Sequence, residues 1–329
     1  MYIGIDISAK TVDLAYRTNG TDSKAEKFEQ SVIGHTKIIK RLKALRPTLV
    51  VMEATGIYYL DLAVALHEAD LPVCVINPKS YHHFAALKLK QVKTDSEDAA
   101  LLAEYAERMT PALWSPPQPT RLALRDVGRQ INRLTGTRTQ AKNRLHALQS
   151  KSMTLRLLIE DEQEGIALLD KRIERLQKAA LELIAQDIQL SQQIKCMCAA
   201  KGVAIASAIA LLGELSVLPV TLKAPQVSRH AGMDIRLCQS GSSVNKAARL
   251  SKAGNSYLRA ALYMPAMSAI QHDPRAKAFY EALVARGKKK IQALCAVMRK
   301  DLTGLWTCIK SGTPFDSTRL FSEIHLKKA

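Results

Sequence analysis

Short apolar runs alternate with helical spacings over the first hundred residues. Continuous apolar runs predict buried strands, and a run in which apolar and polar residues alternate predicts a strand with one exposed face. Strands are therefore expected at residues 1–8, 11–18, 24–31, 48–56 and 71–78, and amphipathic helices at residues 33–45 and 57–69. Three strands followed by strand–helix units predict an α/β layer with parallel central strands.

A proline-rich segment at residues 111–119 cannot continue a helix and marks a boundary. Beyond it the spacing of apolar residues alternates between three and four, which is the heptad pattern of a coiled coil. The first series comprises Leu124, Val127, Ile131, Leu134, Ala141, Leu145 and Leu148, and the second comprises Ile166, Leu169, Ile173, Leu176, Ala180 and Leu183. We expect a long antiparallel coiled-coil hairpin that turns near residues 159–165.

The pattern changes again near residue 192, where small apolar residues become frequent. Residues 201–215 resemble a helix-hairpin-helix module, in which a glycine turn offers backbone N–H groups to a phosphate. Ala204 stands where a second glycine would ease that turn, so a helix packed through small residues explains the segment equally well. Three domains are expected: an α/β domain at 1–112, the proline linker and hairpin at 113–190, and a mainly helical domain at 191–329.

The chain is strongly basic, with 48 Lys and Arg residues against 30 Asp and Glu residues and a formal net charge of +18. Such an excess usually faces a polyanion such as nucleic acid, and an aromatic content of 5% argues against base stacking as the main binding device. Residues 118–156 hold nine Lys or Arg residues and one acid. We expect Arg125, Arg129 and Arg133 to contact phosphates, with a solvated helix face as the alternative.

Three features of the sequence bear on location. No run of 18 uncharged apolar residues occurs, so no membrane span is expected. The opening residues carry an acid within their apolar run and have no basic leader, which argues against a signal peptide. The six cysteines are scattered without the pairing of a zinc site, and we expect reduced thiols in a cytoplasmic protein.

Two aspartates, Asp95 and Asp98, stand three residues apart at the start of an expected helix. Two explanations are possible. Either the aspartates belong to a capping pattern, in which the side chain of Thr94 or Asp95 accepts hydrogen bonds from backbone N–H groups of the first turn, or their carboxylates lie on one face of the helix and hold a metal ion. Asp6 and Glu53 close two expected strands, and ligands of α/β sheets lie beyond the carboxyl ends of the strands. If those strands are neighbours, four carboxylates converge and favour Mg²⁺ or Mn²⁺, which supports phosphoryl transfer.

Several longer motifs accompany this order of acids. They are "GIDISAKTVDLA", "MEATGIYYLDLAVAL", "VCVINP", "KTDSEDAALLAEYA", "AGMDIRLCQSG" and "SKAGNSYLRAALYMPAM". With them, nearly the whole chain resembles the DEDD transposases of bridge-RNA-guided insertion sequences and the related pilin-gene invertases. The resemblance implies a ribonuclease H-like (RuvC-like) N-terminal domain whose metal ligands are Asp6, Glu53, Asp95 and Asp98.

The same resemblance implies a serine nucleophile in the C-terminal domain, matching Ser240 in "CQSGSS". A metal-assisted attack of this serine on a DNA phosphate would give a phosphoserine link and a free 3′-OH. Ser242 stands close by and is the alternative nucleophile. The basic residues that would hold phosphates beside this loop, unless they only form a solvated helix face, are Lys246, Arg249, Lys252 and Arg259.

The resemblance also implies the partners: donor and target DNA, a non-coding guide RNA, and other copies of the chain in a dimer or tetramer. We expect a nucleoid-associated enzyme with no membrane partner. A junction-resolving nuclease would use the same acids with water, but it would not need the C-terminal domain. A sugar kinase or actin-like ATPase would need a second phosphate loop, which we do not find, and a binding protein without activity leaves the acids unexplained.

Overall fold

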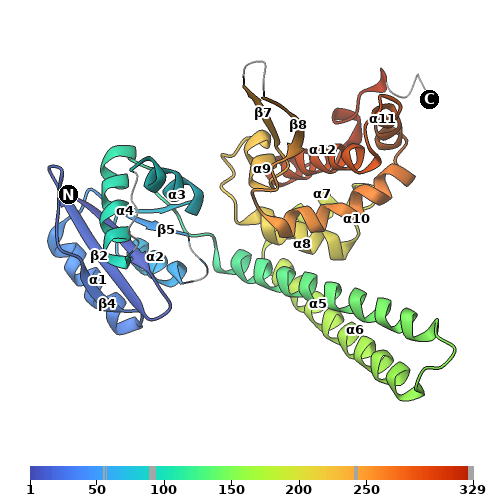
Figure 1. Ribbon diagram of the computed structural model, residues 1–329, viewed down its shortest axis with the longest axis horizontal. Helices are drawn as coiled ribbons and strands as arrows, with labels where there is room; N and C mark the ends of the chain where they lie inside the picture. Colours follow the sequence, from blue (N-terminus) through green and yellow to red (C-terminus); the bar gives the residue numbers. More distant parts are fainter. Residues whose placement is uncertain (55, 57, 89–93, 241–243, 325–329) are drawn as a thin grey trace. The chain divides into compact units, whose positions relative to one another are not determined.

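The chain divides into two compact units, Met1–Pro116 and Pro117–Ala329 (Figure 1). This division comes from a computed structural model that describes residues 1–54, 56, 58–88, 94–240 and 244–324. The first unit mixes strands and helices, and the second is mostly helical, as the sequence predicted. Within the described residues, no helix is both long and apolar enough to cross a membrane.

A mixed sheet forms the centre of the first unit, with strand order β3-β2-β1-β5-β6 and with β4 also paired to β2. The first two strands are antiparallel, whereas β1, β5 and β6 run parallel to one another. The bounds are β1 (Tyr2–Ile7), β2 (Thr11–Thr18), β3 (Thr21–Asp22), β4 (Glu26–Glu29), β5 (Leu49–Glu53) and β6 (Val73–Ile76). The expected central strands, β1 and β5, are therefore neighbours.

Helices cover both faces of this sheet. The helices are α1 (Val32–Leu45), α2 (Tyr59–Glu68), α3 (Pro78–Leu87) and α4 (Asp95–Met109). Because successive side chains of a strand point to opposite faces, Ile3 and Ile5 join one cluster with buried residues of α1 and α2. Val51 of the neighbouring strand belongs to a second cluster with Leu102 and Ala106 of α4.

The helix α4 lies directly on β1, at Gly4. A Cβ atom at Gly4 would stand 2.0 Å from the carbonyl oxygen of Ala99 and 2.3 Å from the nitrogen of Ala103. Both atoms belong to the backbone of α4, so no side-chain rotation could relieve the contact. Only glycine allows this approach, which brings the first turn of α4 to the strand that carries Asp6.

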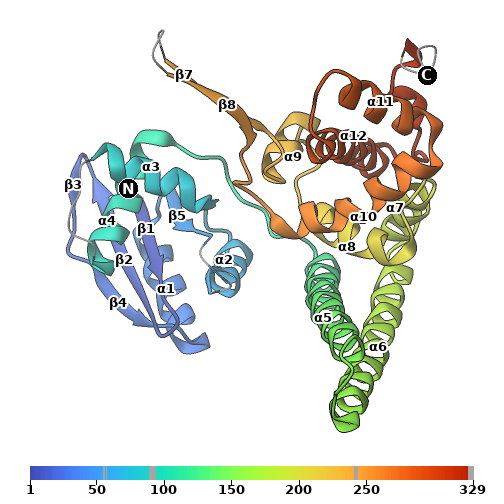
Figure 2. The ribbon, with the colours of Figure 1, turned by 45° about the vertical axis from the view of Figure 1, so that its right-hand side comes forward.

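Two long helices begin the second unit, α5 (Pro119–Gln149) and α6 (Arg156–Ala185), and they pack along each other as a hairpin (Figure 2). Residues of both heptad series are buried, among them Leu124, Ile131, Ala141 and Ile173. The predicted turn at residues 159–165 is wrong, because this segment lies inside α6. Its acids suit the first turns of a helix, and Glu162 pairs with Arg144 of α5 at 2.5 Å.

The remaining helices build one hydrophobic core with the adjoining parts of the hairpin. They are α7 (Ile188–Cys198), α8 (Ile205–Ser216), α9 (Ala224–His230), α10 (Ser256–His272), α11 (Pro274–Ala285) and α12 (Lys290–Ser311). A two-stranded hairpin, β7 (Ile235–Ser240) and β8 (Val244–Leu250), interrupts them. A polar loop rich in Ser and Gly was expected around Ser240, whereas the structure places Ser240 at the end of β7.

The contact at Gly4 generates a test. Replacing Gly4 with Ala should lower the free energy of unfolding by about 3 kcal/mol, because an overpacked site must push α4 away from β1. Replacing Gly136 in α5 is the control, since no atom lies within 4 Å of its would-be Cβ and Ala is the better helix former. That variant should be more stable by about 1 kcal/mol. Chemical denaturation measures both, and a harmless Gly4→Ala would contradict the close approach.

Candidate active site

The carboxyl ends of β1 and β5 bring Asp6 and Glu53 to one edge of the sheet. These strands are parallel neighbours with Ile5 aligned to Met52, so the residues that follow them also stand side by side. Asp6 is the last residue but one of β1, and Glu53 is the last residue of β5. The sequence prediction that the two strands are adjacent is confirmed.

The helix cap at the start of α4 is Thr94, not either aspartate. Its hydroxyl accepts a bond from the nitrogen of Glu97 at 3.4 Å, and its carbonyl accepts one from the nitrogen of Asp98 at 2.9 Å. Asp95 is the first helical residue, and Asp98 follows one turn later. Since Thr94 caps the helix, the carboxylates of both aspartates are available for another role.

The acids influence one another electrostatically. The pKa of Asp6 is raised to about 6, first by burial and then by the negative charges of Asp98, Asp95 and Glu53. Within the described ranges, no three His, Cys, Asp or Glu side chains stand close enough together to ligate an ion. The other three carboxylates are thus within electrostatic reach of Asp6, without forming a closed ligand shell. Their donor chemistry, all oxygen and all acidic, fits a hard divalent cation.

Sequence reasoning missed two polar residues beside these acids. Asp13 of β2 is paired with Asp6 in the sheet register and is only 6% exposed; burial raises its pKa, against the charge of Lys27. Tyr81 of α3 donates a hydrogen bond from its hydroxyl to Oδ1 of Asp98 at 2.6 Å, and burial raises its pKa. An acid inside an apolar strand was the available signal for Asp13, whereas nothing in the sequence indicates the partner of Tyr81.

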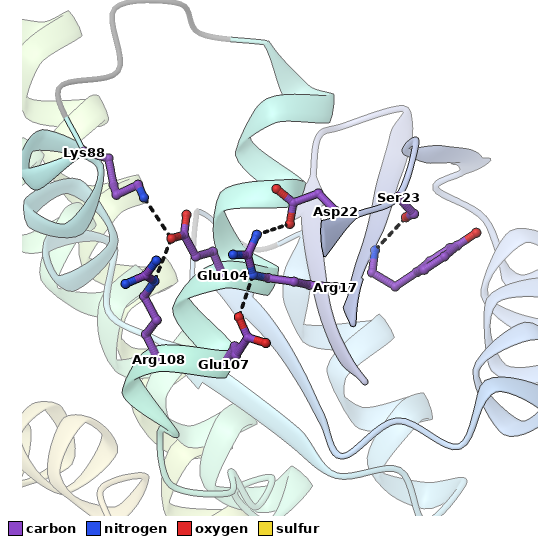
Figure 3. A network of polar contacts seen from close by, with 8 residues as sticks. Arg17, Asp22, Ser23, Lys88, Glu104, Glu107 and Arg108 are labelled. Carbon is purple, nitrogen blue, oxygen red and sulfur yellow. Dashed lines mark hydrogen bonds and ion pairs between the residues drawn. The ribbon is translucent and has the colours of Figure 1, made fainter. Parts of the chain in front are cut away.

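A polar network links α4 to β2 and to Lys88, the residue that follows α3 (Figure 3). Glu104 accepts ion pairs from Lys88 at 2.8 Å and from Arg108 at 2.7 Å, and Arg17 of β2 binds Glu107 at 2.6 Å. Burial alone would raise the pKa of Glu104, but the hydrogen bond from Lys88 and the charges of Arg108 and Arg17 lower it overall. The network holds both α3 and β2 against the helix that carries Asp95 and Asp98.

The predicted nucleophile lies in the other unit. Ser240 is the last residue of β7 and is paired with Val244 of β8 in the register. The base of this hairpin is closed by a hydrogen bond from the nitrogen of Ser251 to the carbonyl of Asp234 at 2.8 Å. The side chain of Ser240, and all of Ser242, fall outside the described part of the chain.

Comparisons with known proteins decide the family. A family model described as transposase matches residues 3–153, and a model described as the transposase IS116/IS110/IS902 family matches residues 195–281. The chain belongs to the IS110 family of transposases. Membership of this family makes it a DNA transposase or recombinase.

Relatives of this transposase include two pilin gene-inverting proteins. That of Moraxella lacunata is 28% identical over 320 residues, covering 96% of this chain and 97% of the relative. That of Moraxella bovis is 27% identical over 321 residues, with the same coverage. An uncharacterized 43.6 kDa protein of insertion element IS110 from Streptomyces coelicolor is 28% identical over 119 residues, which is 35% of this chain and 28% of the relative.

The basic face predicted for α5 of the transposase needs correction at Arg129. Its guanidinium forms a two-bond pair with Glu214 of α8, at 2.5 and 2.9 Å, and lies 4.8 Å from the ring centre of Tyr257. Glu214 is 3% exposed and also accepts a bond from Asn255 at 2.6 Å. Arg129 therefore neutralises a buried acid. Arg133 is exposed, and among the described residues it has no ion pair.

The basic residues near the β7–β8 hairpin also differ from one another. Nη1 of Arg259 donates to the carbonyls of Ala231 at 2.8 Å and Gly254 at 3.2 Å, so that nitrogen already has backbone partners. Arg249 and Lys252 are exposed, whereas the side chain of Lys246 lies outside the described part. Arg125 is half-buried and lies 3.4 Å from Asp126.

The repulsion at Asp6 has a measurable consequence for stability. Because its folded pKa of about 6 exceeds the ordinary value of 3.8, the folded state holds this proton more tightly than the unfolded chain does. The metal-free protein therefore loses stability as the pH rises from about 4 to 6, and the loss persists above pH 6.

The substitution Asp6→Asn should stabilise the protein in chelator at pH 7.5 by about 1 kcal/mol, after the partial exposure of the carboxylate is allowed for. The gain should shrink towards zero as the pH approaches 4, because the wild-type carboxyl is then protonated in the folded state. Thermal unfolding across this pH range measures it. A variant that is less stable than the wild type at pH 7.5 would contradict the conclusion that burial and the neighbouring acids make the charged Asp6 destabilising.

Proposed function

We propose that this transposase cuts and rejoins DNA with Ser240 as nucleophile, assisted by a divalent metal that Asp6, Glu53, Asp95 and Asp98 hold. The observation that carries the metal assignment is the placement of Asp6 and Glu53 at the ends of adjacent parallel strands, with Asp95 and Asp98 in the first turn of the helix that packs on β1; burial and the charges of the other three acids raise the pKa of Asp6, in keeping with this. Bare carboxylates in such a group repel one another, and a bound cation would relieve the repulsion. The oxygen donors favour Mg²⁺ or Mn²⁺.

The order of the strands supports a ribonuclease H-like (RuvC-like) interpretation of the first unit. β2 is antiparallel to β1, β3 and β4, and the later strands β5 and β6 run parallel to β1; two of the acids lie at the ends of β1 and β5, and the other two lie in the first turn of α4, which packs on β1. When bound there, the metal would stabilise charge that develops on the oxygens of a DNA phosphate. The residues themselves orient the ion, and α4 holds two of them rigidly against β1.

The proposed reaction conserves a phosphodiester bond. Oγ of Ser240 attacks a DNA phosphorus atom and gives up its proton to a base, for which the carboxylate group is our candidate. The bond from phosphorus to the 3′-oxygen breaks, and that oxygen leaves as a free 3′-OH. A 3′-OH of another strand then attacks the phosphoserine, which rejoins the DNA and frees the serine. The acids and Ser240 belong to different units, so the reaction needs both units, from one chain or from two chains of a dimer or tetramer.

The names of the Moraxella relatives describe inversion of a pilin gene, and an inversion needs two DNA sites to be cut and rejoined in the same event. We infer that donor and target DNA are the substrates and that a non-coding guide RNA is a partner. We also infer that the hairpin of α5 and α6 pairs with other copies of the chain. Arg133, Arg249 and Lys252 are the basic residues that we expect to meet phosphates, because they are exposed and, unlike Arg129, have no ion pair among the described residues.

A covalent intermediate is the direct test of the mechanism. Stalled reactions of the wild type should show a protein–DNA adduct on denaturing gels, and Ser240→Ala should form none while it still binds DNA. Ser242→Ala is the matched control and should keep the adduct. An adduct that persists in Ser240→Ala but disappears in Ser242→Ala moves the nucleophile to Ser242. Free 5′-phosphate ends without any adduct would mean hydrolysis by water, as in a junction-resolving nuclease.

Phosphate contact along α5 is tested by charge reversal. Arg133→Glu should weaken nucleic-acid binding similarly for all sequences and reduce the slope of log affinity against log salt by about 1 or more. Arg172→Glu is the control: Arg172 is also exposed, has no ion pair among the described residues, and lies on the partner helix α6. Equal losses in the two variants would indicate a general charge effect, and the proposed face on α5 would then be abandoned. Filter binding or fluorescence anisotropy at several salt concentrations measures both.

A further inference from the structure

Tyr81 lies beside Asp6, Glu53 and Asp98, but it belongs to α3, which carries none of the four acids. Its helix, α3, starts directly after β6, where Asn77 caps it by accepting a bond from the nitrogen of Lys79 at 2.9 Å. The last residue of β6, Ile76, is aligned with Glu53 of β5. The first turn of α3 therefore rises from the same sheet edge as Glu53, and Tyr81 lies in that turn.

The ring of Tyr81 packs against apolar residues, and its hydroxyl forms a hydrogen bond with one acid, Asp98. The ring packs against the apolar cluster beneath α4, to which Val51 and Leu102 belong. The hydroxyl donates to Oδ1 of Asp98 at 2.6 Å, and it also lies within electrostatic range of Asp6 and Glu53. Tyr81 thus stands beside three of the four acids and binds one of them directly.

Two further contacts hold α3 and α4 in register. Lys88, which follows the last residue of α3, binds Glu104 of α4 at 2.8 Å (Figure 3). The rings of Phe84 and Tyr105 meet edge to face with their centres 5.2 Å apart. Because both contacts join the same two helices, the hydroxyl of Tyr81 is held at a fixed place relative to Asp98.

A neutral donor on one carboxylate oxygen has a specific effect. It fixes the rotation of the carboxylate and leaves the other oxygen available, without adding a positive charge that would compete with a cation. Hydrogen-bonded partners of this kind orient metal ligands in many sites, and their loss commonly costs 10- to 100-fold in metal affinity. We propose that Tyr81 is a positioning residue that orients Asp98 for binding of the divalent ion, an inference that rests on the proposed metal role of the four acids.

The test uses the full chain and Mn²⁺ as probe. Tyr81→Phe keeps the ring and removes only the hydroxyl, and calorimetry should show Mn²⁺ bound about 10-fold more weakly than by the wild type. The Mn²⁺-induced rise in melting temperature should shrink accordingly, and strand cleavage should return to near the wild-type level at saturating Mn²⁺. Tyr105→Phe is the matched control on the same sheet face, since its hydroxyl has no hydrogen bond among the described residues. It should bind Mn²⁺ like the wild type.

The outcomes separate this inference from the proposed function. If the wild type binds Mn²⁺ and Asp98→Asn does not, but Tyr81→Phe binds as tightly as the wild type, Tyr81 has no positioning role and only this inference is overturned. A lower melting temperature of Tyr81→Phe in chelator, with unchanged Mn²⁺ affinity, likewise assigns a purely structural bond. If the wild type itself binds no Mn²⁺, the metal site fails and the inference fails with it.

Discussion

The site depends on the contact between a helix and a strand that are about ninety residues apart in sequence. At Gly4 the backbone of α4 approaches β1 so closely that a single methyl group would overlap it. Two of the four acids lie on that helix, and a third lies on that strand two residues beyond the glycine. The repulsion felt by Asp6 follows from this contact, because a helix displaced by a methyl group would carry Asp95 and Asp98 away. Packing therefore forces like charges together, and the ion pairs that Glu107 and Glu104 of α4 form with Arg17 and Lys88 help to hold them there.

A second close approach organises the helical unit in a comparable way. Gly128 of α5 and Gly213 of α8 lie where these helices cross, and a Cβ at Gly213 would come within 3.0 Å of the Cα of Arg125. The crossing brings Arg129 to the buried Glu214, which in turn binds Asn255 at the start of α10. Asn255 also caps that helix, and its backbone nitrogen binds the carbonyl of His230 at 2.7 Å. The segment that follows the β7–β8 hairpin is thus linked to α5 and α8 through Glu214, whose charge is neutralised by Arg129.

The sequence predicted those features that a short stretch of the chain encodes, and it did not predict contacts between helices that are far apart in the chain. Asp6 and Glu53 were recognisable because each ends an apolar run, and adjacent parallel strands then bring their ends together. The heptad series predicted both long helices, but the turn between them was misplaced, since acids at residues 159–165 suit the start of a helix as well as a loop. The Arg129–Glu214 pair and the Tyr81–Asp98 bond were not predictable. Each requires two helices to pack in a particular register, and no spacing along the chain encodes that register.

The distribution of charge links these observations. The chain carries a large excess of Lys and Arg, yet among the described residues no ion pair involves Asp6, Asp95 or Asp98. Asp13, which is paired with Asp6 in the sheet register, does have a basic partner, because it lies 3.8 Å from Lys27. Had an Arg been packed against Asp6 as Arg129 is against Glu214, its charge would offset the repulsion among the acids and would oppose the cation binding that we propose. The neutral hydroxyl of Tyr81 is the kind of partner that such a group can accept, because it orients a carboxylate without neutralising it.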